Sequence, residues 1–170
     1  MPKLHLVEGP VGAGKSTFSK SLALRTNGIH IALDEWFAKL YSADRPATNV
    51  IDWYMERKSR LLDLIWRHSN AVLATGTDAV LELGLIQRQS RIALYEKARS
   101  ADIELKVYVL DAPKDVRLER VLRRNTEKGA TFSMVVPEQV FEMANSMWEA
   151  PDASECNSVS VEFVTQPLKV

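Results

Sequence analysis

A short glycine-rich stretch near the start of the chain, GPVGAGKST, has the residue types and spacing needed to hold a phosphate. It matches the pattern G-x-x-x-x-G-K-[ST] without a mismatch. Glycines let the backbone curl and point N–H groups inward, the lysine reaches the outer phosphates, and the hydroxyl that follows can ligate Mg²⁺. The residues expected to contact a nucleotide are therefore Gly9, Val11, Gly12, Ala13, Gly14, Lys15, Ser16 and Thr17.

The segments on either side are those that a phosphate-binding loop requires. Residues 3–8 form an apolar run that predicts a buried strand, and residues 15–25 place Phe18 and Leu22 at helical spacing. The loop would then open a helix, whose N-terminus favours negative charge. The alternative is a chance glycine turn with a surface lysine, and the flanking strand and helix argue against it.

Strands and helices alternate along the rest of the chain. Further strands are predicted at residues 29–33, 78–83, 104–110 and 159–164. Helices are predicted from Asn49 or Asp52 to residue 74 with a break or bend at Ser69-Asn70, over 85–101 and 114–125, and from Pro137 with Val140, Phe141, Ala144, Met147 and Trp148 on one face. This alternation predicts an α/β fold with a five-stranded parallel sheet covered on both faces. Ligands in such folds bind beyond the carboxyl ends of the strands.

Asp34 follows the second predicted strand and is the candidate general base. Phosphoryl transfer to a hydroxyl needs a carboxylate that orients or deprotonates the incoming group. The alternative role for Asp34 is an N-cap of a short helix over residues 35–40. Glu35 is the nearest rival as base and could also complement a helix dipole in the first turn.

Glu82 lies inside the apolar strand Val80-Leu81-Glu82-Leu83 and is the candidate acid of the metal site. A charge in an apolar strand is costly unless it is used or paired. Ser16 would be the direct ligand of Mg²⁺, and Glu82 would act through water. The alternative is an edge position that faces water.

Positive charge for the transferring phosphoryl group would come from the arginine-rich segment after the fourth strand. Arg120, Arg124 and Lys128 are interpreted as parts of a lid over about residues 117–136 that closes on the phosphates. Arg117 and Arg123 are interpreted as a solvated face paired with nearby carboxylates. After the third strand, Arg88 and Arg91 would either clamp an anionic substrate or lie on the surface.

Composition narrows the classes of function. The chain of 170 residues is expected to form one domain, and its 22 basic and 22 acidic residues give no net charge, which disfavours a nucleic-acid substrate. The single cysteine, Cys156, lies in a predicted polar loop and fits a reduced, cytoplasmic setting. No apolar run approaches membrane-spanning length, so no membrane partner is expected.

Four stretches together resemble one group of enzymes: GPVGAGKST, LDEW, VLELG and LDAPKDVRLERVLRRNTEKG. They are similar to the small P-loop kinases of the AAA_33, or zeta-toxin and chloramphenicol-phosphotransferase-like, group, to which the kinase domains of polynucleotide 5′-kinases are related. The resemblance covers about residues 3–151. It implies a three-layer P-loop NTPase fold of the NMP-kinase type with a small helical lid.

The resemblance also implies roles for particular residues. Asp34 would be the general base, and Arg124-Asn125 with Lys128-Gly129 would match the lid motif. Adenine would be held between Arg120 or Arg124 and Ala150-Pro151. The third-strand acid is usually aspartate in the group, whereas this chain has Glu82. Polynucleotide kinases carry an arginine shortly after the base, where this chain has Phe37 and Ala38, and this difference disfavours nucleic-acid acceptors.

The function expected from the sequence is transfer of the γ-phosphate of ATP to a hydroxyl of a small molecule, with Mg²⁺ as cofactor. The acceptor would lie between residues 34–46, the long helix and the region after Glu82, in a monomer or homodimer. Its pocket would be lined by Trp36, Phe37, Tyr41, Trp53 and Tyr54, unless these side chains only pack helices onto the sheet. Two alternatives stay open: a polynucleotide 5′-hydroxyl kinase, and a regulatory nucleotide-binding protein without an acceptor.

Overall fold

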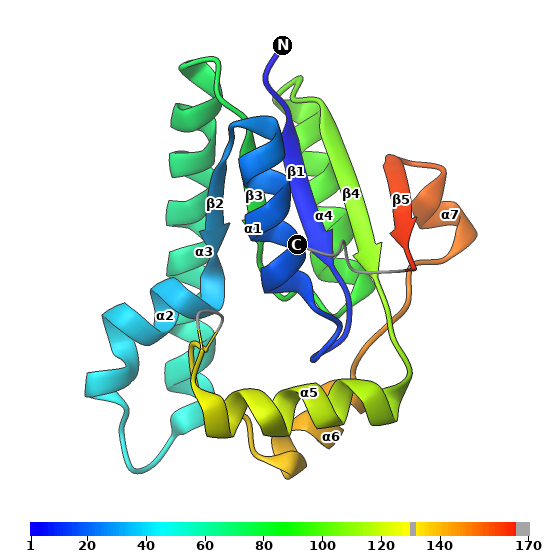
Figure 1. Cartoon of the computed structure of the whole chain (residues 1–170). Coiled ribbons are helices and arrows are strands. Elements are labelled where there is room, and N and C mark those ends of the chain that lie inside the picture. Colours follow the sequence, from blue (N-terminus) through cyan, green and yellow to red (C-terminus); the bar gives the residue numbers. More distant parts are fainter. Residues whose placement is uncertain (130–131, 166–170) are drawn as a thin grey trace.

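The computed structural model describes residues 1–129 and 132–165 of the chain. Its strands form one five-stranded, all-parallel sheet in the order β2-β3-β1-β4-β5 (Figure 1). The strands are β1 (Leu4–Glu8), β2 (Ile29–Ala32), β3 (Ala79–Glu82), β4 (Leu105–Leu110) and β5 (Ser160–Val164). The predicted α/β fold is confirmed, and every strand end falls within one residue of its predicted position.

Helices connect the strands in the expected places. They are α1 (Lys15–Thr26), α2 (Leu33–Tyr41), α3 (Val50–Ala74), α4 (Arg88–Ser100), α5 (Lys114–Glu127), α6 (Glu138–Ser146) and α7 (Ala153–Cys156), with a 3₁₀ helix at Ser42–Asp44. Of the break or bend predicted at Ser69-Asn70, the break is wrong, because α3 continues to Ala74, and the two side chains bond back to the carbonyls of Ile65 and Trp66. Cys156 ends the short helix α7 and does not lie in a loop.

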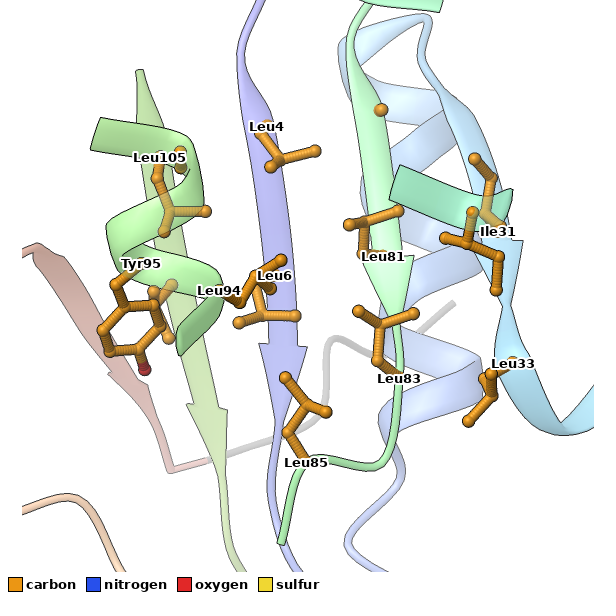
Figure 2. Close-up of a cluster of buried hydrophobic side chains, with 14 of the residues drawn as sticks. Leu4, Leu6, Ile31, Leu33, Leu81, Leu83, Leu85, Leu94, Tyr95 and Leu105 are labelled. Carbon is orange, nitrogen blue, oxygen red and sulfur yellow. The ribbon is translucent and has the colours of Figure 1, made fainter. Parts of the chain in front are cut away.

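The sheet is covered on both faces, and alternate residues of β1 show how. Val7 packs with Phe18 and Leu22 of α1 on one face. Leu4 and Leu6 join the larger core on the opposite face, with Leu94 and Tyr95 of α4 (Figure 2) and with buried residues of α3. Because successive strand residues point to opposite faces, a central parallel strand must be apolar almost throughout. His5, on the same face as Val7, is buried and bonded through Nε2 to Asp78 at 2.9 Å.

Aromatic side chains join α2 to α3. Phe37 is buried at the centre of this cluster, with its ring centroid 5.1 Å from Tyr41, 5.6 Å from Trp53 and 4.9 Å from Tyr54. Trp36 is partly buried against the same core. Of the five aromatics, only Tyr54 lines the cleft, so the packing alternative holds for the other four, whose side chains join the two helices.

The carboxyl ends of β1, β2 and β3 bring three chemical groups to one edge of the sheet. The glycine-rich loop follows β1, Asp34 lies in the first turn of α2, and Glu82 is the last residue of β3. Helix α5 crosses the molecule beyond this edge (Figure 1). Within the residues that the structure describes, no helix combines the length and apolar character needed to cross a membrane.

Candidate active site

The loop after β1 has the backbone geometry of a phosphate cradle. Gly9, Gly12 and Gly14 have φ values of 146°, 81° and 95°, which side-chain-bearing residues rarely adopt. The Lys15 ammonium donates hydrogen bonds of 2.9 Å to the carbonyls of Gly9 and Pro10, which closes the loop on itself. The N-terminus of α1 therefore points its free backbone N–H groups into a concave site, an arrangement that binds anions.

Gly12 marks the closest approach between the loop and α5. A Cβ built there would lie 2.5 Å from the carbonyl oxygen of Arg117. The Arg117 guanidinium in turn donates to the carbonyl of Val11 at 3.1 Å and to Oδ1 of Asn145, on α6, at 2.7 Å. Arg117 is buried, so its predicted place on a solvated face is wrong: its side chain holds the loop, α5 and α6 together.

Ser16, Glu82 and His30 form a chain of hydrogen bonds across three elements. The Ser16 hydroxyl donates to Oε1 of Glu82 at 2.7 Å, and His30 Nε2 lies 3.1 Å from Oε2 of the same carboxylate. Burial raises the pKa of Glu82, but the hydrogen bonds from His30 and Ser16 and the charge of Lys15 outweigh it, so the pKa is lowered. The carboxylate is thus held ionised beside Ser16, and because β3 is an inner strand the predicted water-facing edge alternative is wrong.

These groups fit a magnesium ion by their chemistry. Mg²⁺ prefers oxygen ligands and keeps several waters when it binds with nucleotide phosphates. The Ser16 hydroxyl and the Glu82 carboxylate are adjacent oxygen donors at the end of the phosphate loop. They could hold the ion directly and through water, respectively.

Asp34 faces the same site from α2. The N-cap of α2 is Ala32 and Asp34 lies inside the helix, so the N-cap alternative is wrong. Desolvation by the surrounding protein and the negative charge of Glu82 raise the pKa of Asp34, whereas the positive charges of Lys15 and Lys58 act to lower it. Asp34 is nevertheless exposed to the water of the site. A carboxylate with a raised pKa is a stronger proton acceptor than an ordinary aspartate.

One large cleft of about 1420 Å³ joins these groups. Its walls come from the phosphate loop, the end of β2, α2, the first half of α3, residues 82–87 at and after the end of β3, α5 and α6. Single small-molecule sites have volumes of roughly 300–1,000 Å³. The cleft is therefore large enough for a nucleotide and a second ligand together.

The predicted lid residues have different positions relative to this cleft. Arg120 and Arg124 line it, and Nε of Arg124 is buried with no hydrogen-bond partner among the described residues. Arg123 is exposed as predicted but also lines the cleft. Lys128 ends α5, is exposed, and does not line the cleft. Residues 130–131 of the predicted lid lie outside the described part of the chain, and closure of the lid stays a prediction.

Neither arginine after β3 is available as a clamp for an anionic substrate. Arg91 is fully buried and donates to both carboxylate oxygens of Glu155, at 2.6 and 2.9 Å, with Glu8 at 3.4 Å. Arg88 lies on the surface, paired with Asp152 at 3.3 Å and bonded to Ser154. Both arginines instead tie the start of α4 to the segment that follows α6.

Three features of the site were not found from the sequence. His30 gave no signal because it is a single histidine in a short strand, although strand register places it on the same face as Ala32, the partner of Glu82. Lys58 lies on the face of α3 that lines the cleft, and only the helical spacing of Tyr54, Lys58 and Leu62 could have indicated it. The third feature is a set of methionines that line the cleft: Met55, Met134, Met143 and Met147.

The predicted contact between Pro151 and the nucleotide is not supported by the residues that line the cleft. Pro151 is half-buried and is not among the residues that line it. An adenine site between a lid arginine and Ala150-Pro151 therefore remains a prediction.

The sheet order, the phosphate loop and the two strand-end carboxylates define a kinase-like P-loop nucleotide-binding protein. The chain belongs to the AAA_33 family of AAA domains, whose family model matches residues 4–151. The resemblance identified in the sequence is thereby confirmed.

Individual relatives are consistent with this family. A cytidylate kinase from Haloarcula marismortui is 31% identical over 124 residues, and the matched region is 73% of this chain and 59% of that protein. Kti12 from Chaetomium thermophilum, solved with ADP-AlF3, aligns with a TM-score of 0.70 at 19% identity over 95% of this chain and 88% of its own. A gluconokinase from Sinorhizobium meliloti aligns with a TM-score of 0.62 at 20% identity, over 98% and 85% of the two chains.

Proposed function

We propose that this protein transfers the γ-phosphoryl group of ATP to a hydroxyl of a small molecule, with Asp34 as general base. The observation that carries the proposal is the position of Asp34 in the same cleft as Lys15, Ser16 and Glu82. A phosphate loop alone would only bind a nucleotide. A second carboxylate, open to the cleft and separate from the one bonded to Ser16, supplies the group that an acceptor hydroxyl needs.

In the proposed reaction the acceptor oxygen attacks the γ-phosphorus in line with the bond that breaks. The hydroxyl proton passes to the Asp34 carboxylate, the new P–O bond forms, and the bond between the γ-phosphorus and the bridging oxygen breaks, releasing ADP. Lys15 and the loop N–H groups neutralise charge on the β- and γ-phosphates. Arg120 and Arg124 supply further positive charge over the transferring group.

Magnesium held beside Ser16 and Glu82 would neutralise charge on the phosphate oxygens when it is bound. The role of the protein is to hold the two oxygen donors, the Ser16 hydroxyl and the Glu82 carboxylate, in position. His30 does this indirectly, because it holds the carboxylate whose other oxygen receives the Ser16 hydroxyl.

A small acceptor is favoured over a nucleic acid by the charges on the acceptor side of the cleft. Its acceptor side carries Lys39 and Lys58 but also Asp34 and Glu35, and the chain has no net charge. Proteins that bind nucleic acid usually need an uncompensated basic surface along the backbone. The kinase activity named for the Haloarcula relative and the gluconokinase-like fold support phosphoryl transfer in general.

The experiment that tests the proposal is transfer from γ-labelled ATP to a panel of nucleosides, sugars, aromatic alcohols and 5′-hydroxyl oligonucleotides. We expect label on a small acceptor, and loss of that label with Asp34→Ala. Label on oligonucleotides alone would establish the polynucleotide alternative. Label only as free phosphate, at equal rates in both proteins, would establish a regulatory nucleotide-hydrolysing protein.

A further inference from the structure

Methionines are concentrated in the cleft. The chain has five methionines, and all except Met1 line it: Met55, Met134, Met143 and Met147. Met55, Met143 and Met147 are exposed, with 57%, 56% and 43% of their surfaces accessible. Large apolar side chains left open inside a cleft indicate a binding surface for an apolar group.

The orientation of α6 produces most of this surface. Val140, Met143, Ala144 and Met147 recur at helical spacing and line the cleft. Phe141 is fully buried beneath the Arg117 guanidinium, and Asn145 is bonded to the same arginine. The sequence prediction that Val140 and Phe141 lie on one face is therefore wrong, because Val140 lines the cleft and Phe141 is buried away from it. The rotation of α6 is fixed by Phe141 and Asn145, and the methionines are consequently turned into the cleft.

Contacts just beyond the end of α6 place the Met147 end of this helix on the acceptor side. The Glu149 N–H donates to the Ile86 carbonyl at 2.9 Å, and the Arg88 N–H donates to the Glu149 carboxylate at 2.6 Å. The end of α6 thus adjoins the connection that follows β3. In the sheet, β3 is the neighbour of β2, and β2 leads to Asp34. Leu85 and Ile86 of this connection also line the cleft. Met55 enters the same cleft from α3.

The two arginines after β3 are not available to an anionic acceptor, and Lys39 and Lys58 share the acceptor side with Asp34 and Glu35. Arg88 and Arg91 are tied to Asp152 and Glu155, as described above. Methionine side chains are flexible and polarisable, and their sulfur atoms make favourable contacts with aromatic rings. The acceptor side therefore offers a carboxylate base beside an adaptable apolar wall.

We propose that Met55, Met143 and Met147, termed here the methionine wall, bind an aromatic ring of the acceptor while its hydroxyl faces Asp34. The substrate class is a hydroxyl-bearing aromatic compound, in preference to a sugar or a nucleoside monophosphate. This proposal rests on the proposed kinase function for the identity of the ligand as acceptor. Binding to the wall can be measured without phosphoryl transfer.

The test uses N-phenylnaphthylamine, a neutral aromatic fluorophore whose emission rises in an apolar site. We expect it to bind the wild-type protein and to be displaced by phenylethanediol, but not by glycerol or ATP. In Met143→Gln/Met147→Gln its Kd should rise about tenfold, because two apolar contacts are lost. Leu24→Gln is the matched control, since Leu24 is 85% exposed on α1 outside the cleft.

Three other outcomes overturn the proposal that the methionine wall binds an aromatic ring of the acceptor. Displacement by ATP would assign the wall to adenine, and an unchanged Kd in the double variant would place the fluorophore elsewhere. Absence of fluorophore binding to the wild type would show that the wall takes no aromatic ring. If the fluorophore behaves as expected but no acceptor is phosphorylated, the kinase function fails while aromatic binding stands.

Discussion

The Ser16 hydroxyl donates a 2.7 Å hydrogen bond to Oε1 of Glu82, which joins the residue after the loop lysine directly to the end of β3. His30 holds the other oxygen of that carboxylate from β2. The neighbouring strands β2 and β3 therefore fix the position of the Ser16 hydroxyl, through His30 and Glu82. The metal site of the proposed kinase depends on this connection.

Replacement of Glu82 should weaken magnesium use. In Glu82→Gln the carboxylate charge is lost while the shape is kept, so the Mg²⁺ concentration that gives half-maximal turnover should rise about 10- to 100-fold. A magnesium titration at saturating ATP measures this. Glu104→Gln, which removes an exposed carboxylate paired with Lys3, should leave the titration unchanged. An unchanged titration in Glu82→Gln would remove Glu82 from the metal site.

Gly12→Ala should weaken nucleotide binding. Its Cβ would meet the Arg117 carbonyl at 2.5 Å, so either the loop or α5 must move. We expect the Kd for ATP to rise at least about tenfold, measured by calorimetry. Gly76→Ala is the matched control, because Gly76 also has a positive φ but meets no atom within 4 Å. It should lose about 1 kcal/mol of stability and keep its ATP affinity. Equal ATP affinities in the two variants would contradict the close approach.

The buried cluster of Glu8, Arg91, Tyr95 and Glu155 should make stability depend on pH. Burial raises the pKa of Glu8 from 4.5 to about 8. The folded state thus binds this proton more tightly than the unfolded state. The resulting stabilisation is complete below pH 4.5 and is lost as the pH rises toward about 8. The loss reaches up to about 1.4 kcal/mol per pH unit.

Glu8→Gln imitates the protonated acid, so it should remove this part of the pH dependence. Urea unfolding between pH 5 and pH 8, compared with the wild type, measures the difference at roughly 1.4 kcal/mol per pH unit at most. Glu104→Gln should follow the wild-type curve. Parallel curves for the wild type and Glu8→Gln would show that Glu8 is already ionised in the folded protein.

Arg124 should act mainly on the rate of transfer. Its buried Nε has no partner among the described residues, and its charge acts on both Lys15 and Asp34. Loss of one donor aimed at developing charge typically costs about 10²- to 10³-fold in kcat. We expect such a loss in Arg124→Met, and no change in Arg99→Met, where an arginine at the end of α4 is replaced. A kcat within twofold of the wild type would exclude Arg124 from transition-state contact.

Much of this architecture could be predicted from local patterns. The strands are apolar runs, and the phosphate loop is a contiguous motif with a strand before it and a helix after it. The strand-end rule placed Asp34 and Glu82 at one site because it depends only on the direction of parallel strands. The structure brings both residues to the same cleft.

The roles of the arginines could not be predicted in this way. Arginines at helical spacing look like a solvated face, yet Arg91 and Arg117 are buried. Their partners are distant in sequence: Glu155 is 64 residues from Arg91, and Val11 is 106 residues from Arg117. Such pairs depend on how elements pack, which periodicity within one helix does not contain. Met143 and Met147 of the methionine wall were missed for the same reason, because the rotation of α6 is set by contacts with Arg117.

The central claim, that Asp34 accepts the proton of the acceptor hydroxyl, is tested most directly by transfer kinetics of Asp34→Asn beside Glu35→Gln. Both variants neutralise an acid on α2 that lines the cleft, and only one removes the proposed base. With the acceptor from the panel and γ-labelled ATP, kcat of Asp34→Asn should fall about 10²- to 10⁴-fold with ATP binding retained, whereas Glu35→Gln should stay near the wild type. Near-normal transfer by Asp34→Asn, or an equal loss in Glu35→Gln, would contradict the account.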